Sequence, residues 1–357
     1  MRAAPGAGIA PGGEDGMRAM VLRERGGEPA LERRAIPVPG PGEALVRVRA
    51  VGIGVTNELA RQGELGGAFP VVPGHELSGT IAALGPDVEG WEAGEPVTAT
   101  FYLLCGSCRW CLGGRETLCE QMGGYLGIAV DGACADYLVL GAASLVRIPE
   151  GVAIEDAGIV ADAVATALHV VERRLRVAPG ERIAVVGGGG PLGLHTLQMI
   201  RVAGGVPIAV ERDAARAAEV EARGLADAVV HAQRPDWADE LRAVAGDRLA
   251  GVVDTVGSQA SLAEGLRALG RGGTLAVLGH TPGATLEVDP VRLLLEEQVV
   301  TGTRYATREE ISRTLELVAL GRVEPVVGAR LPLERLGEAL ELARSGATFG
   351  RILLDVS

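Results

Sequence analysis

Hydrophobic and polar residues alternate along much of the first 150 residues of the chain. The stretch 44–51, ALVRVRAV, places apolar and charged side chains in turn, as a strand with one buried face does. Further short apolar runs, VVPGHELSGTIAALG, EPVTATF and DYLVL, are separated by Gly and Pro turns. This pattern predicts a first domain made mostly of β-strands.

The pattern changes after about residue 160. Apolar, β-branched runs at RIAVV, VPIAV, GVVDTV and GTLAVLG then alternate with Ala-rich amphipathic stretches of helical period. Strands that alternate with helices in this way predict βαβ units and a parallel sheet. The predicted fold class is therefore α/β, with a β-rich domain joined to a doubly wound parallel-sheet domain.

Composition indicates a globular protein of about two domains. The chain has 357 residues, 47% hydrophobic and 22% charged, which suits a large core and excludes global disorder. A net charge of −12 argues against a nucleic-acid partner, because nucleic acids select a basic face. All 34 basic residues are Arg, which excludes lysine chemistry such as a Walker A loop or a Schiff base.

Neither a membrane span nor a secretion signal is evident in the sequence. A spanning helix needs about 18 or more consecutive apolar residues, and the chain has no such run. Residues 1–16 are small and rich in Pro and Gly, without the apolar segment of a signal peptide. They predict a flexible tail, and we expect a cytoplasmic protein.

Four of the five cysteines are crowded into CGSCRWCLGGRETLC. They follow the spacing C-x2-C-x2-C-x7-C and are Cys105, Cys108, Cys111 and Cys119. Four thiolates this close suit a closed tetrahedral zinc site, whereas a large chain without a secretion signal does not need a disulfide framework. Free thiols and an iron–sulfur cluster are the alternatives. We predict structural zinc in a lobe over about 101–121 and a buried, apolar role for Cys134.

A glycine-rich loop marks the first strand-to-helix junction of the second half, in VVGGGGPLGLHTLQMI. Gly188, Gly190 and Gly193 satisfy G-x-G-x-x-G, and Pro191 and Leu192 complete the turn. Because the motif follows an expected strand at 182–186 and opens a helix, its backbone can face a pyrophosphate. A loop without ligand is the alternative interpretation. The context predicts a Rossmann domain that binds a nicotinamide dinucleotide.

An acidic residue after the next strand is expected to bind the ribose of that cofactor. Glu211 ends VPIAVE at this place. A carboxylate there accepts from both ribose hydroxyls and repels a 2′-phosphate, which favours NAD. The neighbouring Arg212 leaves NADP open, and a surface glutamate at a strand end is the alternative.

Several ordered motifs together resemble the medium-chain dehydrogenase/reductase superfamily, in its zinc alcohol dehydrogenase branch. They are MRAMVL, PGEALVRVRAVGIG, VPGHELSGTI, the cysteine lobe, GGGPLG and GRILLDV, and they cover nearly the whole chain from Met17. The resemblance implies a β-rich, chaperonin-10-like catalytic domain at 17–161 and 303–357, interrupted by the Rossmann domain at 162–302. It also implies a homodimer or homotetramer.

The catalytic zinc site is where the chain departs from that family. Zinc members carry a cysteine where this sequence has Gly54, and a relay histidine where it has Leu59. The resemblance leaves His75 and Asp162 as two metal ligands, with Glu76 as the only further candidate. A catalytic zinc normally has three protein ligands, so we expect that this second metal is absent.

The resemblance also implies roles for residues outside the metal site. Thr56 occupies the position of the proton-relay hydroxyl, and His75 or Asp162 is expected to supply a proton. Thr166 corresponds to a residue that packs against the nicotinamide. Arg351, in FGRILL, corresponds to an arginine that meets the pyrophosphate, although an ordinary surface arginine is the alternative.

These features favour an NAD(P)H-dependent oxidoreductase that transfers hydride to an activated, conjugated C=C bond. Such an acceptor delocalises the developing charge, and its carbanion can attack a second carbon, so a reductive cyclase of secondary metabolism is included. The alternatives are a zinc-dependent alcohol or polyol dehydrogenase and a non-enzymatic cofactor sensor. Small and apolar residues in LARQGELGGAFP and QMGGYLGIAV, without an ionic clamp, predict a fairly hydrophobic small-molecule substrate.

Overall fold

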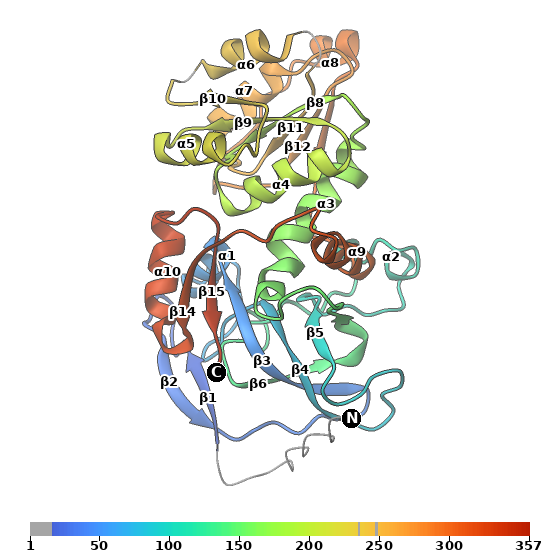
Figure 1. The fold of residues 1–357 in the computed structure, drawn as a ribbon, viewed down its shortest axis with the longest axis vertical. Helices are drawn as coiled ribbons and strands as arrows, with labels where there is room; N and C mark the ends of the chain where they lie inside the picture. Colours follow the sequence, from blue (N-terminus) through green and yellow to red (C-terminus); the bar gives the residue numbers. More distant parts are fainter. Residues whose placement is uncertain (1–15, 235, 247–248) are drawn as a thin grey trace. The chain divides into compact units, whose positions relative to one another are not determined.

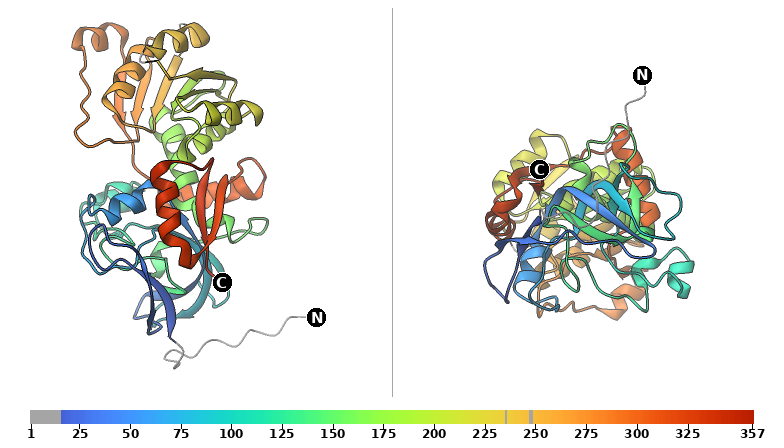
Figure 2. Two further views of the ribbon diagram at one scale, coloured as in Figure 1. Left: turned by 90° about the vertical axis from the view of Figure 1, so that its left-hand side faces the viewer. Right: turned by 90° about the horizontal axis from the view of Figure 1, so that it is seen from below.

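The structure, a computed structural model, describes residues 16–234, 236–246 and 249–357, which form two compact units. Unit 1 runs from the first described residue to Asp162 and includes Thr307–Leu320 and Val327–Ser357, and unit 2 comprises Ala163–Ala306 and Gly321–Val326. The expected flexible tail lies, except for Gly16, outside the described residues. Figures 1 and 2 show the elements of each unit.

Unit 1 is rich in β-strands. Its strands are β1 (Met17–Val21), β2 (Ala30–Arg34), β3 (Glu43–Ile53), β4 (Glu76–Leu84), β5 (Pro96–Ala99), β6 (Tyr137–Gly141), β7 (Leu145–Arg147), β14 (Val327–Pro332) and β15 (Arg351–Asp355). Its α-helices are α1 (Val55–Arg61), α2 (Arg109–Leu112), α9 (Arg308–Ala319) and α10 (Leu336–Ser345). The larger sheet has the order β14-β15-β3-β4-β5-β7, with β6 also paired to β3, and α10 packs against β14 and β15 (Figure 2).

Strand β3 is the centre of this sheet, and it includes the alternating stretch that the sequence predicts. It pairs antiparallel with β4 on one side and with β15 on the other. In that register Gly52 lies opposite Glu76, and Ile53 lies opposite Ile352. The end of β3 therefore meets the beginnings of β4 and β15 (Figure 1).

Unit 2 is a doubly wound parallel sheet, as the βαβ pattern predicts. Its strands, all paired in parallel, are β8 (Arg182–Val186), β9 (Val206–Glu211), β10 (Ala228–His231), β11 (Leu249–Asp254), β12 (Thr274–Val277) and β13 (Val299–Gly302). Its α-helices are α3 (Ala165–His169), α4 (Pro191–Val202), α5 (Ala214–Ala222), α6 (Trp237–Ala245), α7 (Gln259–Ala268) and α8 (Pro290–Glu296). The strand order is β10-β9-β8-β11-β12-β13. Successive strands are added on one side of β8 up to β10 and on its other side from β11 onward, so the order of addition reverses between β8 and β11. Ligands of open α/β sheets bind at such a reversal, outside the carboxyl ends of the strands.

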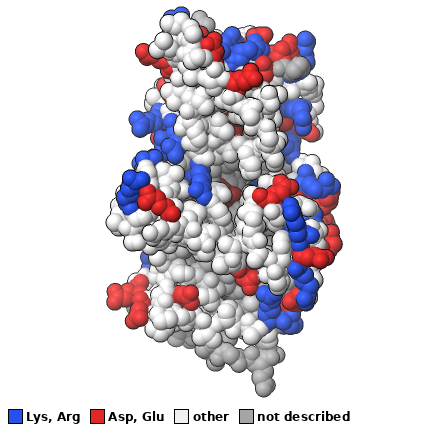
Figure 3. Space-filling model, turned by 180° about the vertical axis from the view of Figure 1, so that it is seen from behind, with Lys and Arg blue, Asp and Glu red and all other residues white. Residues whose placement is uncertain are grey.

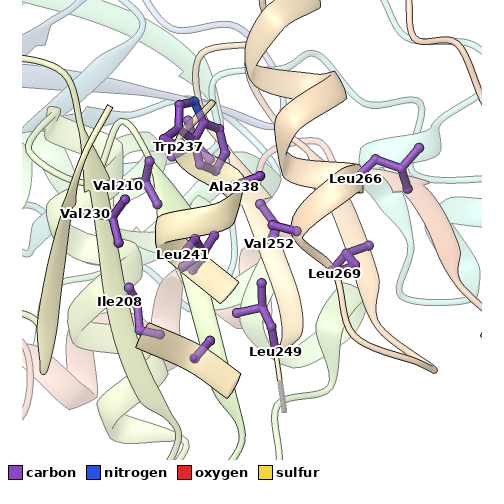
Figure 4. Packing of buried hydrophobic residues seen from close by; sticks show 14 of the residues in the cluster. Ile208, Val210, Val230, Trp237, Ala238, Leu241, Leu249, Val252, Leu266 and Leu269 are labelled. Atoms are coloured by element: carbon purple, nitrogen blue, oxygen red, sulfur yellow. The ribbon is translucent and has the colours of Figure 1, made fainter. Parts of the chain in front are cut away.

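The core on one face of this sheet is built from aliphatic residues around one tryptophan (Figure 4). Trp237 and Leu241 of α6 pack toward Ile208 and Val210 of β9 and Val252 of β11. Each is at least nine-tenths buried. Because aromatics make up only 3% of the chain, this tryptophan supplies an unusually large share of the apolar area here.

The surface carries mixed charge. On the face in Figure 3, arginine and acidic side chains are interspersed rather than gathered into areas of one sign. Within the described residues, no helix combines the length and the apolar character that crossing a bilayer requires.

Candidate active site, cofactor loop and metal-binding lobe

The strand ends of unit 1 bring a buried ion pair into the sheet. Glu76, the first residue of β4, is completely buried, and Arg351, the first residue of β15, is 8% exposed. One carboxylate oxygen of Glu76, Oε2, accepts from Nε of Arg351 at 2.7 Å and lies 2.6 Å from Nη2. A Cβ at Gly52 would fall 2.3 Å from that oxygen, so only glycine fits opposite Glu76.

Asp162 and His75 extend this ion pair into a chain of polar contacts. Oδ2 of Asp162 lies 3.4 Å from Nη2 of Arg351 and 3.3 Å from Nε2 of His75. Asp162 belongs to a π-helical turn, Val160–Val164, and such turns often re-aim side chains at functional sites. The His75 ring is 2% exposed and is held edge-on by Phe101, with ring centroids 4.9 Å apart.

The Arg351 guanidinium fills the space beside Gly54. A Cβ built on Gly54 would lie 2.0 Å from Nη1 and 2.4 Å from Cζ of Arg351. Gly54 has an extended backbone, so close approach, and not an unusual dihedral angle, requires glycine here. Asn57 fixes the turn, because its Oδ1 accepts from the Gly54 N–H at 3.0 Å. A side chain at position 54 and this placement of Arg351 exclude each other.

Burial alone would lower the pKa of Arg351, because a charged guanidinium loses its hydration. The negative charges of Glu76 and Asp162, and the hydrogen bond to Glu76, act in the opposite direction and hold the pKa above its ordinary value. The guanidinium is therefore a permanent cation at this place.

A second metal does not fit this site while the guanidinium is in it. One donor atom from each of His75, Glu76 and Asp162 lies within 4.8 Å of the other two, which is close enough for a shared ion. However, a zinc ion about 2 Å from both carboxylates would meet the guanidinium that already binds them, and the two cations would repel. These donors suit a metal only after Arg351 has moved away.

Thr56, the expected proton-relay residue, lies in the first turn of α1 and is half-buried. It therefore belongs to the same strand-end region as Gly54. Sequence reasoning missed Gly52 and Asn57, which shape this region. The sequence holds only weak signals for them: a glycine two residues before Gly54, and an amide where the family pattern has an aspartate.

The four predicted cysteines come together in a lobe formed by α2 and a 3-10 turn, Glu116–Leu118. Their sulfur–sulfur distances include 3.5 Å for Cys108–Cys111, 3.5 Å for Cys105–Cys119 and 3.9 Å for Cys105–Cys111. A tetrahedron of sulfurs about 2.3 Å from a zinc ion has edges of about 3.8 Å. The lobe therefore has the size of a tetrathiolate zinc site. All five cysteines lie in the described part of the chain, and none forms a disulfide.

Local hydrogen bonding prepares part of the lobe for a metal. Backbone N–H groups of Ser107 and Cys108 lower the pKa of Cys105 to about 6. Burial, together with hydrogen bonds to neighbouring thiols, raises the pKa of Cys111 to about 12. The Cys105 thiol therefore ionises more readily than an ordinary cysteine, and Cys111 must lose its proton when a metal binds. By contrast, burial raises the pKa of Cys134, which keeps that thiol neutral.

The glycine loop of unit 2 connects β8 to α4, in the context that the sequence predicts. Gly190 is the N-cap of α4, and Pro191 is its first residue, so Leu192 and Gly193 lie in the first turn. A Cβ on Gly193 would come within 2.1 Å of the Gly187 carbonyl oxygen. This close packing of helix on loop is what the third glycine of a dinucleotide motif provides, and the loop fits a pyrophosphate.

Glu211 ends β9 beside this loop. Its Oε2 accepts from the Gly189 N–H at 2.9 Å, and its Oε1 accepts from the Arg212 and Asp213 N–H groups at 2.8 and 2.9 Å. Glu211 is 94% buried and its carboxylate is held by three backbone N–H groups, whereas Arg212 is exposed. Thr166 is buried in α3.

The fold and these three sites define a two-domain nicotinamide-dependent oxidoreductase with metal-binding cysteines. Comparisons with known proteins agree. The family model for the alcohol dehydrogenase GroES-like domain matches residues 40–150, and the model for the zinc-binding dehydrogenase domain matches residues 191–319. The chain belongs to the zinc-type alcohol dehydrogenase branch of the medium-chain dehydrogenase/reductase superfamily.

Individual relatives include enzymes with two kinds of reaction. An alcohol dehydrogenase of Moraxella sp. is 34% identical over 95% of this chain and 99% of its own. An acryloyl-coenzyme A reductase of Sulfurisphaera tokodaii is 27% identical over 91% of this chain and 95% of its own. The crystal structure of an NAD-dependent alcohol dehydrogenase superposes with a TM-score of 0.89, at 30% identity, over 96% of this chain and 100% of that one.

Proposed function

We propose that the protein is an NAD(P)H-dependent reductase of C=C bonds conjugated to a carbonyl group, and that its catalytic site works without zinc. The observation that carries this proposal is the Arg351 guanidinium beside Gly54. Position 54 offers no metal donor, and two of the three remaining donors, Glu76 and Asp162, already bind the guanidinium.

The site's chemistry then favours an acceptor that spreads its own charge. Reduction of an isolated ketone concentrates negative charge on one oxygen, which zinc would stabilise by several kcal/mol. The bound nicotinamide supplies a hydride. A conjugated carbonyl takes that hydride at its β-carbon, and the charge spreads over an enolate. Such a substrate needs hydrogen-bond donors more than a Lewis acid.

The chain's own residues provide those donors and a route for a proton. The Thr56 hydroxyl can donate to the carbonyl oxygen. His75 and Asp162, whose Nε2 and Oδ2 atoms lie 3.3 Å apart, can hold the proton that the α-carbon receives. Acryloyl-coenzyme A reductases among the relatives, 27% and 28% identical, support this reaction type, because acryloyl thioesters are conjugated alkenes.

A single substrate tests this proposal, because a conjugated enone contains both a C=C bond and a carbonyl group that can accept the hydride. The purified protein is supplied with 2-cyclohexenone and either NADH or NADPH, and the products are separated by gas chromatography. We expect cyclohexanone, the product of hydride addition to the β-carbon. Cyclohexenol as the only product, or no product with any conjugated ketone or enoyl thioester tested, would overturn the proposal.

A zinc-dependent alcohol or polyol dehydrogenase is the second candidate. It is favoured by the metal-sized grouping of His75, Glu76 and Asp162 and by the alcohol dehydrogenase relatives. It requires Arg351 to leave the site. NAD-linked alcohol oxidation that stops when a chelator removes a second zinc, and returns with zinc, would establish it.

We further propose one structural zinc at Cys105, Cys108, Cys111 and Cys119, on the sulfur spacing described above. Glu211 favours NADH over NADPH as the cofactor.

Strand β13 ends the sheet of unit 2 and exposes Val299 and Val300, and Leu294 of nearby α8 is 75% exposed. An apolar strand edge of this kind suits pairing with a second copy, hence a homodimer. Unpaired cysteines suit the reducing cytoplasm.

A further inference from the structure

We propose that Arg351 is the catalytic cation of this enzyme: its guanidinium replaces the second zinc ion and donates through Nη1 to the substrate oxygen that becomes negative. This inference rests on the proposed function and adds to it the residue that stabilises the charge.

Arg351 lies where metal-binding atoms would otherwise be. A side chain at position 54 would begin 2.0 Å from Nη1, so the guanidinium fills the volume of a ligand at that position. The same guanidinium contacts Glu76 and Asp162, two of the three residues that could hold an ion. The guanidinium therefore brings a positive charge to the two carboxylates that a metal would otherwise bind.

Two nitrogens of the guanidinium bind the carboxylates, and the third is the one assigned to the substrate. Nε and Nη2 carry the contacts to Glu76, and Nη2 also faces Asp162. Nη1 takes part in none of these contacts and lies nearest to position 54. An arginine fixed on one side by a buried carboxylate loses little freedom when its other side binds an oxygen.

The reaction step balances with this assignment. The substrate accepts two electrons and one hydrogen at its β-carbon from the reduced cofactor, which becomes oxidised. The electrons of the C=C bond move toward the carbonyl, and the enolate oxygen accepts a hydrogen bond from Nη1. One proton, held by His75 and Asp162 and replaced from water, then adds to the α-carbon and regenerates the carbonyl. A hydrogen-bond donor aimed at such an oxygen typically contributes about 10²–10³-fold to the rate.

The first experiment counts zinc and does not depend on activity. Zinc per chain is measured by mass spectrometry in the wild type, in His75→Ala and in the double variant Gly54→Cys/Arg351→Ala. The matched control is Gly54→Cys/Arg344→Ala, which adds the same thiol but removes an exposed arginine instead. We expect one zinc in the wild type and in His75→Ala, because the lobe holds it. Removing Arg351 while adding a thiol should raise the count to two, and the Arg344 control should not.

Two results of this experiment would overturn the inference. A second zinc in the wild type that disappears in His75→Ala would show that metal and guanidinium coexist. A count that stays at one in a folded Gly54→Cys/Arg351→Ala variant would show that the arginine is not what excludes the metal. Circular dichroism identifies a variant that has not folded, and in that case the wild type and His75→Ala decide the question.

The second experiment separates stabilisation of the oxyanion from binding of the cofactor. Single-turnover hydride transfer to an enone at saturating cofactor is compared in the wild type, Arg351→Lys, Arg351→Gln and Arg351→Ala. We expect Arg351→Gln to be about 10²–10³-fold slower, with a cofactor Kd within about threefold of the wild type. Methylguanidinium should partly restore Arg351→Ala, which a purely structural role would not allow.

The opposite pattern would overturn the inference. If Arg351 serves only the cofactor pyrophosphate, its removal weakens cofactor binding and leaves the saturated rate unchanged. If the wild type reduces no conjugated carbonyl, the proposed function fails. The zinc counts still decide whether the guanidinium replaces the metal.

Discussion

Substitution of Glu76 by glutamine should destabilise unit 1 strongly. The change keeps the size and one hydrogen-bond acceptor but removes the negative charge that faces Arg351. Glu76 is completely buried, and the side chain of Arg351 is 9% exposed, so water cannot replace the lost charge. The substitution leaves an arginine in the protein interior with only Asp162, 3.4 Å from Nη2, as its counter-charge.

The expected loss follows from this geometry. Removal of one partner of a buried ion pair typically costs about 3–5 kcal/mol, because the other charge stays buried without compensation. Asp162 still faces the guanidinium, which places the expected loss at the lower end, about 3 kcal/mol. In the double variant Glu76→Gln/Arg351→Gln the stranded charge is gone as well. Its free energy of unfolding should therefore exceed the value expected from adding the two single losses, by about 1–2 kcal/mol.

Hydrogen exchange of the β15 amides measures this change within unit 1, independently of unit 2. The matched control is Glu341→Gln, the same chemical change in an exposed i,i+3 pair with Arg344, whose side chains are about 60% exposed. We expect the protection of the β15 amides in the control to match that of the wild type. Equal protection of β15 in Glu76→Gln and in the control would refute the claim that the ion pair holds the ends of the strands together.

Four further predictions concern the other sites. Cys108→Ser should lose the lobe's zinc, measured as zinc per chain, and an unchanged zinc content would contradict the tetrathiolate site. Trp237→Ala should destabilise unit 2 by about 3–5 kcal/mol in urea denaturation, since the indole is 94% buried; a loss below about 1 kcal/mol would contradict its place in the core. Glu211→Ser should lower the ratio of kcat/KM for NADH to that for NADPH by about tenfold, whereas an unchanged ratio would remove Glu211 from cofactor choice. Leu294→Glu should shift sedimentation toward a monomer, and an unaltered dimer would place the interface elsewhere.

The features that the sequence predicts well are contiguous. The strand expected at 182–186 matches β8, and the glycine loop follows it, because both depend on neighbouring residues. The cysteine lobe is equally local, since its four thiols lie within 15 residues and a short loop can only bring them together. The doubly wound sheet of unit 2 follows from repeated alternation of strands and helices, which is also a local signal.

The arrangement around Arg351 could not be predicted in the same way. Glu76 and Arg351 are 275 positions apart, and their contact depends on the register of β4 and β15 against β3. Register is a property of the complete sheet, and no nearby motif specifies it. Asp162 reaches Arg351 from a π-helical turn, which no residue pattern predicts. The sequence predicts Gly54 as a missing ligand, but not the group that lies beside it.

Gly54 and Arg351 are best understood as one coupled feature. Loss of a cysteine ligand alone would leave a weakened metal site, which one substitution could repair. With the guanidinium 2.0 Å from the place of a new Cβ, a cysteine restored at position 54 first has to displace a buried cation from two carboxylates. On the proposed function, a metal with a cysteine ligand at position 54 therefore requires both positions to change together. On the proposed mechanism, this coupling would let a member of the family keep its fold and cofactor loop while a guanidinium supplies the positive charge of its active site.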